Sequence, residues 1–224
     1  MDFLRLIKKG SSKSIECCAN ELWAMQQVIN KYISKYSWYS LDNKELVTKD
    51  KDQWLSEIIK SHIKDIKRND KIDVDKFYEN EFGNTYAVSV DRSFEYFKVT
   101  YILGNISDSG SSDVLMIDNI TKGISSNKEV YLGLFKDLIE IFNPDHGTIS
   151  SRDLAYSIID FATKEIWTGW MTYVSNRLIS KKIEGFEMIE TNEGVIYIVS
   201  NENGDPEIFN KRVCDLTHLI RQLS

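Results

Sequence analysis

The stretch Phe186–Ser200, FEMIETNEGVIYIVS, constrains the fold most because it predicts an antiparallel hairpin. Two apolar runs flank Thr-Asn-Glu-Gly, whose asparagine and glycine suit a tight turn. A second hairpin is predicted from NTYAVSVD and SFEYFKVTYILG, two short aromatic and β-branched segments that meet at Asp91-Arg92. DVLMID adds a short apolar strand. The sequence therefore predicts a sheet whose neighbouring strands run antiparallel.

Other segments have the periodicity of amphipathic helices. Apolar residues recur at three- and four-residue steps over 15–36, 54–66 and 130–142. The last of these has a capping-box start at Ser126 and Glu129. A further helix is predicted to begin with Asp205 as its N-cap and Pro206 at its first position. The order of the segments predicts an α+β fold, an antiparallel sheet with helices packed on it, in a single domain over residues 1–224.

The composition is typical of an ordered globular protein. Hydrophobic residues make up 42% of the chain, aromatic residues 12%, and only two residues are proline. No apolar run approaches the roughly 20 residues of a spanning helix, and the start MDFLRLIKKG does not resemble a signal peptide. Cys17, Cys18 and Cys214 are odd in number and two are adjacent, which does not suit a disulfide framework. We therefore expect a soluble protein of the reducing cytoplasm that does not contact a membrane.

No pattern in the sequence predicts a metal or cofactor site. His62, His146 and His218 have no second histidine or cysteine at the spacings that zinc sites use, apart from the ordinary helical pair of Cys214 and His218. Glycine-rich phosphate-binding motifs and a serine nucleophile elbow are absent. Cys17 and Cys18 fall on or beside an apolar helix face, which favours burial over catalysis. We expect no metal and no cofactor.

One acidic motif comes close to the arrangement found in metal-dependent nucleases. In SVDRSFEYFK, however, Glu95 and Lys98 are three residues apart and would point to opposite faces of a strand. The basic run HIKDIKRNDK is interrupted by Asp65 and Asp70 and does not form a stripe for nucleic acid. We therefore expect no catalytic residue and no nucleic-acid binding, which favours a protein that acts by binding.

Acidic residues concentrate near the C-terminus. Seven acids and no lysine or arginine lie between Ile183 and Glu207, while the net charge of the chain is −6. An acidic patch disfavours phosphate backbones and attracts a basic partner. A solvated acidic face without a partner is the alternative interpretation.

The stretch IWTGWMTYVS, Ile166–Ser175, raises the choice between an aromatic binding site and a core strand. In a strand its side chains alternate: Trp170, Thr172 and Val174 to one side, Met171, Tyr173 and Ser175 to the other. Gly169 would let another element approach closely or permit a bulge. Because large rings contribute large buried areas, a core strand with Trp170 in the core is favoured.

GWMTYVSN, Gly169–Asn176, resembles the Gly-Trp motif of the immunity protein 52 family, although Val174 stands where leucine is usual. These are small bacterial proteins encoded beside polymorphic or type VI secretion toxins. FEMIETNEGVIYIVS and NGDPEIFNKRVCDLTHLIRQL are similar to the strands and closing helix of that family, and IEIFNPDHGTISS to the segment before the motif. The resemblance is clearest over 127–224. It implies that Gly169, Trp170, Thr172 and Tyr173 are structural.

The resemblance also implies a function. Such a protein binds and neutralises a cognate toxin, typically a restriction-endonuclease-like nuclease domain delivered by a secretion system, and is not an enzyme. Because acids can compete for the cationic cleft of a nuclease, we expect Glu184, Glu187, Glu190 and Glu193 to form part of the toxin-binding surface. A homodimer is compatible with this interpretation, but the sequence does not predict it.

Two alternatives stay open at this stage. One is a scaffold or adaptor of a secretion system, which would present an extended apolar patch on its first or second helix. The other is an enzyme whose acidic residues, such as Asp91 and Glu95, converge only in three dimensions.

Overall fold

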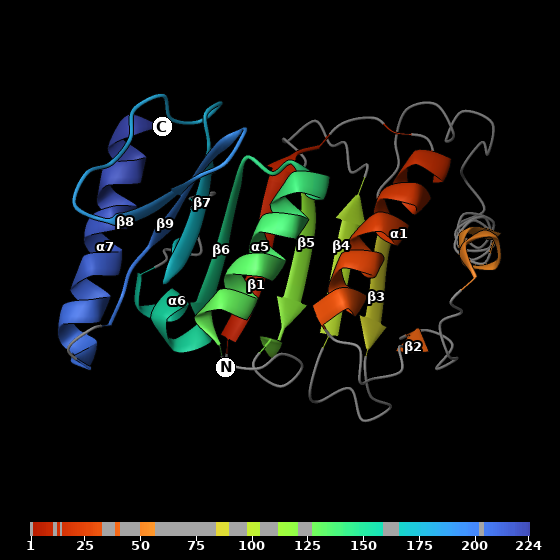
Figure 1. The fold of residues 1–224 in the computed structure, drawn as a ribbon, viewed down its shortest axis with the longest axis horizontal. Coiled ribbons are helices and arrows are strands. Elements are labelled where there is room, and N and C mark those ends of the chain that lie inside the picture. The colour runs from red at the N-terminus through yellow and green to blue at the C-terminus, as the bar shows by residue number, and fades with distance from the viewer. Residues whose placement is uncertain are drawn as a thin grey trace, which may run out of the picture.

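The computed structural model describes residues 2–10, 13, 15–32, 39–40, 50–56, 84–89, 98–103, 112–120, 127–158, 166–201 and 204–224. These residues form one nine-stranded sheet in the order β2-β3-β4-β5-β1-β6-β7-β9-β8 (Figure 1). Every neighbouring pair in it is antiparallel. The strands are β1 (Asp2–Lys9), β2 (Tyr39–Ser40), β3 (Asn84–Ser89), β4 (Lys98–Leu103), β5 (Ser112–Asp118), β6 (His146–Ser151), β7 (Met171–Ser175), β8 (Glu187–Glu190) and β9 (Gly194–Ile198). The predicted α+β fold with an antiparallel sheet is confirmed.

The helices lie on both faces of this sheet. They are α1 (Ile15–Tyr32), α5 (Lys128–Phe142), α6 (Arg152–Ile158) and α7 (Pro206–Leu223), and residues 51–56 are also helical. Figure 1 shows α1 and α5 side by side across one face. Tyr173 and Ile196 point into the core beneath α1 and α5, whereas Val174 and Tyr197 point into a second core that includes residues of α7. Because successive side chains of a strand point to opposite faces, β7 and β9 each contribute residues to both cores.

Both hairpins are present where the structure describes them. β8 and β9 pair with Ile189 opposite Ile196, as the sequence predicts. β3 and β4 also pair antiparallel, but their connection at Asp91-Arg92 lies outside the described residues. DVLMID forms β5, next to the central strand β1. β1 was not predicted from the sequence; its buried Leu4 and Leu6 lie on either side of the charged Arg5.

The helix starts differ in one respect from the prediction. The N-cap of α5 is Asn127, whose side chain accepts a hydrogen bond from Glu129 N–H at 2.8 Å, so Ser126 as the cap is wrong. For α7 the prediction is confirmed, because Asp205 accepts from the N–H groups of Glu207 and Ile208. Of the helix predicted over 54–66, only the part up to residue 56 is described.

The position of Trp170 corrects the simple alternation expected for its segment. β7 begins only at Met171, and Trp170 packs against Tyr131 of α5 with ring centroids 5.6 Å apart. Trp170 therefore lies on the α5 face, not with Thr172 and Val174, and it is partly buried. The close approach expected at Gly169 is confirmed, since a Cβ there would lie 2.2 Å from Ile149 O.

A cluster of partly buried charges ties α1 to the sheet. Glu21 of α1 accepts hydrogen bonds from both Lys8 and Lys13. Lys13 also lies 3.3 Å from the buried Asp113, and Lys8 donates to Phe142 O at 2.8 Å. Burial lowers the pKa of Lys8. We call Lys8, Lys13, Glu21 and Asp113 the lysine–glutamate cluster.

Candidate functional site

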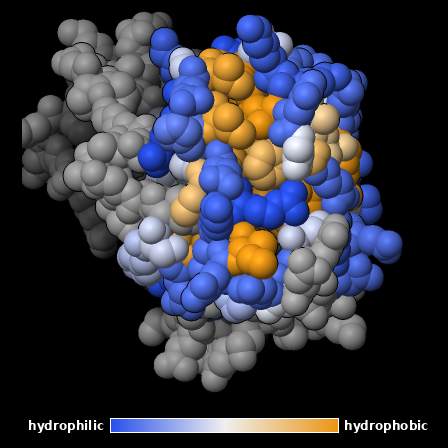
Figure 2. Space-filling view, turned by 90° about the vertical axis from the view of Figure 1, so that its left-hand side faces the viewer, coloured by the Kyte–Doolittle hydropathy of each residue, from blue (hydrophilic) through white to orange (hydrophobic). Residues whose placement is uncertain are grey.

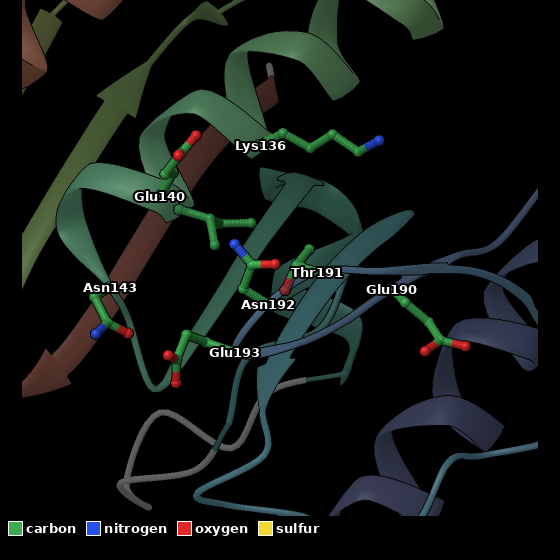
Figure 3. Close-up of a pocket in the computed structure, with 8 residues that line it drawn as sticks. Lys136, Glu140, Asn143, Glu190, Thr191, Asn192 and Glu193 are labelled. Atoms are coloured by element: carbon green, nitrogen blue, oxygen red, sulfur yellow. The ribbon is translucent and has the colours of Figure 1, made fainter.

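A hollow of about 410 Å³ lies between the C-terminal end of α5 and the turn that joins β8 to β9 (Figure 3). Its lining consists of Lys136, Ile139, Glu140 and Asn143 on the α5 side, and Glu190, Thr191, Asn192 and Glu193 on the turn side. We call it the α5–turn hollow. Seven of its eight lining residues are polar or charged, and only Ile139 contributes an apolar side chain.

The α5 wall of the hollow is held in place by the chain that follows the helix. Asn143 ends α5 in the left-handed conformation, with φ of 47°, and its N–H donates to Ile139 O at 2.8 Å. Arg177, just beyond β7, donates to Asn143 O at 3.0 Å and to Pro144 O at 3.1 Å. The same guanidinium lies 3.2 Å from the Asp145 carboxylate. These contacts fix the helix end against the end of β7.

The opposite wall is equally constrained. The N–H and the hydroxyl of Thr191 donate to Gly194 O at 2.9 and 3.0 Å, which closes the turn. Asn176 N–H donates to Glu193 O at 2.7 Å. A Cβ on Gly194 would lie 2.3 Å from Val174 O, so only glycine allows β7 to approach this closely. Both walls are thus attached to the same end of β7, and the hollow is preformed.

The α5–turn hollow is acidic. Three carboxylates and one ammonium group line it. Glu190 pairs with Lys182 at 2.6 Å, but within the described residues neither Glu140 nor Glu193 has an ion pair. Figure 3 shows Glu140 on the α5 side and Glu193 on the turn side. Unpaired carboxylates on facing walls favour a cation between them.

Tyr173 of β7 lies beneath the turn wall. The residue is fully buried, and its ring runs along Gly194. Its hydroxyl lies beside the Thr191 side chain. Burial raises the pKa of Tyr173, so the hydroxyl stays protonated.

The structure separates the four glutamates that the sequence analysis grouped. Glu190 and Glu193 both line the hollow. Glu187 instead faces the N-terminal end of α5, where it pairs with Lys128 at 2.9 Å. Glu184 is exposed in the loop before β8. Glu140 could not be predicted as part of this site, because it lies on a helix about fifty residues earlier in the chain and comes close to the turn only through the fold.

The residues considered for chemistry lie apart from one another, on α1, β6 and α7, where the structure describes them. Among the described residues, no cluster of three or more histidine, cysteine or acidic side chains could hold a metal. Cys18 is buried, and burial raises the pKa of its thiol to about 12. His218 is exposed and contacts Gln222 at 2.8 Å. His62, Asp91 and Glu95 lie outside the described residues.

Another pair of buried polar groups lies on the sheet face opposite α1 and α5. The Arg5 guanidinium stacks 3.9 Å from the ring centre of Trp167. Arg5 Nη1 and His146 Nε2 are both buried and have no hydrogen-bond partner among the residues described. Burial, together with the nearby charge of Arg5, lowers the pKa of His146 to about 4. His146 is therefore neutral in the folded protein at neutral pH.

The end of the molecule formed by α7 and the β8–β9 hairpin is shown in Figure 2. Apolar side chains emerge there in separate groups, with a hydrophilic band between them. The large hydrophobic residues exposed within the described ranges are Ile141, Tyr156, Met188, Ile208 and Leu223. None of these lies on α1; the adaptor hypothesis expected an apolar patch there or on the second helix, of which residues 57–66 lie outside the described ranges. No described helix is long and apolar enough to cross a membrane.

Comparison with protein-family models gives no match. Comparison with curated proteins gives no significant match either. Among solved structures, the chain is similar to one described as Pseudomonas aeruginosa T6SS protein PA0821, with a TM-score of 0.58 and 10% sequence identity. The match covers 96% of this chain and 72% of that chain. At this identity the likeness shows a shared fold.

Proposed function

We propose that the protein is an immunity protein, which binds a cognate toxin of a type VI secretion system and neutralises it without catalysis of its own. The observation that carries this proposal is the fold, which nearly the whole chain shares with a protein described as a T6SS protein. The resemblance of GWMTYVSN to the immunity protein 52 family supports the finer assignment. The protein would act in the cytoplasm of the producing cell.

The geometry of the α5–turn hollow supports a binding role. Its walls are held by hydrogen bonds to the end of β7, and a preformed surface loses little conformational freedom when a partner binds. Its unpaired carboxylates suit a cationic partner. We propose a nuclease domain as the toxin, because a nuclease needs a cationic cleft for the phosphate backbone.

The resemblance motif fits this proposal as a structural support of the surface. Gly169 lets β7 start close to β6, and Trp170 packs on α5. The other end of β7 continues into Asn176 and Arg177, which hold the two walls of the hollow. The motif would therefore position the binding surface and make no contact with the toxin.

Co-expression with the product of the neighbouring gene tests the proposal. We expect that product to be toxic alone, cells to survive when this protein is present, and the two proteins to co-elute in size-exclusion chromatography. A neighbouring product that is harmless, or survival without a complex, would contradict neutralisation by binding.

A secretion adaptor is the second candidate, since the likeness to a T6SS protein would fit it as well. An adaptor would bind the neighbouring product and be required for its export, but deleting it would not kill the producing cell. Viability of the deletion strain therefore separates the two functions.

A further inference from the structure

We propose that Arg5 and His146 form a binding site for a carboxylate group on the sheet face opposite α1 and α5. The carboxylate accepts hydrogen bonds from the Arg5 guanidinium and from Nε2 of His146. This site goes beyond the proposed function, because it lies on the other face of the sheet from the α5–turn hollow and takes a ligand of the opposite charge.

The pairing of β1 with β6, neighbours near the centre of the sheet in Figure 1, brings the two residues together. Ile7 of β1 lies directly opposite His146 of β6. Arg5 lies directly opposite Thr148 in the same pair of strands. Residues two apart along a strand share a face of the sheet, as do directly opposite residues. Arg5 and His146 are therefore diagonal neighbours, roughly 7–8 Å apart in a typical sheet and within reach of long side chains.

Arg5 is a half-buried cation without an acidic partner in the described part of the chain. Its Nη1 is buried and makes no hydrogen bond with any described residue. Burial lowers the pKa of Arg5 to about 10, because removing the guanidinium from water disfavours its charge. Buried charges are normally paired, since their desolvation is expensive. The fold therefore holds a guanidinium that an anion would compensate.

Two carboxylates close to these strands are already paired. Asp118 of β5 forms an ion pair with Arg152 at 3.1 Å. Asp145, directly before β6, forms one with Arg177 at 3.2 Å. Neither carboxylate is left to neutralise Arg5, so its charge calls for an anion from outside the described part of the chain.

His146 is the second group that lacks a partner. Its Nε2 is buried and makes no hydrogen bond with any residue that the structure describes. The imidazole is neutral near pH 7, because burial and the charge of Arg5 lower the pKa of His146 to about 4. A neutral imidazole still carries one N–H group, which in the Nε2 tautomer can donate to an anion. One carboxylate held by Arg5 would thus satisfy buried nitrogens of both residues.

Trp167 orients the guanidinium for this role. The Arg5 Cζ lies 3.9 Å from the centre of the Trp167 ring, and that ring packs edge-on against Phe3 with centroids 6.1 Å apart. Stacking on an aromatic ring uses the flat face of a guanidinium, whereas its N–H groups lie in its plane and point outward. A carboxylate bound in that plane can accept two parallel hydrogen bonds. The donors are therefore arranged before the ligand arrives.

Charge and surroundings favour a carboxylate over a phosphate. Arg5 supplies one positive charge and His146 supplies none near pH 7, which matches a singly charged anion. A phosphate group carries about −1.5 to −2 charges and would leave negative charge uncompensated. Met116 lies directly opposite Arg5 on β5 and packs with Trp167 in a small apolar cluster. This cluster suits the carbon skeleton of an organic acid.

NMR titration of the protein with sodium propionate tests the site without any toxin, so its failure leaves the proposed function untouched. We expect shifts confined to the Trp167 indole N–H and to the amides of residues 4–6 and 146–148, saturating in the millimolar range that so small a ligand allows. Propionamide, which has the same shape without the charge, should give no saturating shift. Equal shifts with propionamide, or no saturation with propionate, would overturn the site.

Charge-matched variants test the role of Arg5. We expect Arg5→Gln to weaken propionate binding at least about tenfold, while the melting temperature stays the same or rises because an uncompensated buried charge is removed. The control Arg221→Gln removes the same charge at an exposed position and should bind within about twofold of the wild type. Equal weakening in both variants would show a net-charge effect. An Arg5→Gln protein with a lower melting temperature and unchanged binding would show a structural arginine. Either result would overturn the proposal.

Variants of His146 test the second donor and leave Arg5 in place. His146→Leu removes the donor and should weaken propionate binding about tenfold. His146→Gln keeps an N–H donor and should stay within about threefold of the wild type. Unchanged binding in His146→Leu would overturn the two-residue site.

Acetyl-Gly-Asp-Gly-amide identifies the source of the carboxylate. Binding of this peptide at least as tight as that of propionate would support an acidic side chain of a protein as the ligand. Binding of propionate alone would support a small organic acid. Binding of neither, or tighter binding of inorganic phosphate than of both, would overturn the carboxylate site.

Discussion

The lysine–glutamate cluster and the α5–turn hollow contain the same residue types, but they differ in whether their carboxylates are paired with lysines. In the cluster, Glu21 is largely enclosed and accepts from two lysines. In the hollow, Glu140 and Glu193 stand on rigid walls with no basic partner in the described part of the chain. Acidic residues alone therefore do not mark a binding surface. What distinguishes the hollow is carboxylates that the fold holds in place and leaves uncompensated.

Glu21→Ala should give the largest loss of stability, about 3–5 kcal/mol, because Lys8 and Lys13 would lose their shared partner while partly buried. Chemical denaturation measures this loss. Glu140→Ala is the matched control, and its free energy of unfolding should change by less than about 0.5 kcal/mol. Similar losses at the two positions would erase the distinction between cluster and hollow.

Acid should destabilise the protein through His146, whose buried Nε2 has no hydrogen-bond partner among the described residues. Its pKa in the folded protein is about 4, below the 6.5 of an unperturbed histidine, so the unfolded state binds the proton first. This contribution to stability is complete above pH 6.5 and is lost as the pH falls toward 4. We expect a loss of about 3 kcal/mol over this window.

Denaturation at a series of pH values checks this expectation, with His146→Gln as the comparison. The variant should have a flatter profile between pH 6.5 and 4. Identical profiles for variant and wild type would place the acid sensitivity elsewhere.

Trp170→Ala should lower the free energy of unfolding by about 2–3 kcal/mol, since the ring is only partly buried and its main described contact is Tyr131. Trp170→Phe keeps an aromatic ring against Tyr131 and should cost less. A Trp170→Ala protein as stable as the wild type that no longer bound toxin would move this residue from the scaffold to the interface.

Glu187→Gln should have the smallest effect, below about 0.5 kcal/mol, because its ion pair with Lys128 is half-exposed. Toxin binding should also remain within about twofold of the wild type, since Glu187 lies at the other end of α5 from the hollow. Calorimetry and a binding titration on the same sample measure both quantities. A large loss of affinity would restore the broad acidic surface predicted from the sequence.

Features that depend on nearby residues were predictable from the sequence. The β8–β9 hairpin follows from the turn Thr191–Gly194, and the start of α7 from Asp205 and Pro206. In the same way, the close packing at Gly169 follows from a glycine beside a strand.

Features that depend on residues far apart in the chain were not predictable from the sequence. β1 lacked a clean apolar alternation, because Lys8 points inward to meet Glu21. The hollow combines Glu140 with Glu193, whose proximity follows only from the order of strands in the sheet. The seven-acid segment predicted the right region, but it gave no means of telling Glu187, which is neutralised by Lys128, from Glu193.

Cell survival during co-expression with the neighbouring gene's product tests the central claim most directly. It compares the wild type, Glu140→Lys/Glu193→Lys and Glu184→Lys/Asp215→Lys, each checked for folding by its melting temperature. We predict that the wild type and the control Glu184→Lys/Asp215→Lys protect the cells. The variant Glu140→Lys/Glu193→Lys should be folded and should not protect them. Equal protection by all three proteins would contradict toxin capture at the α5–turn hollow.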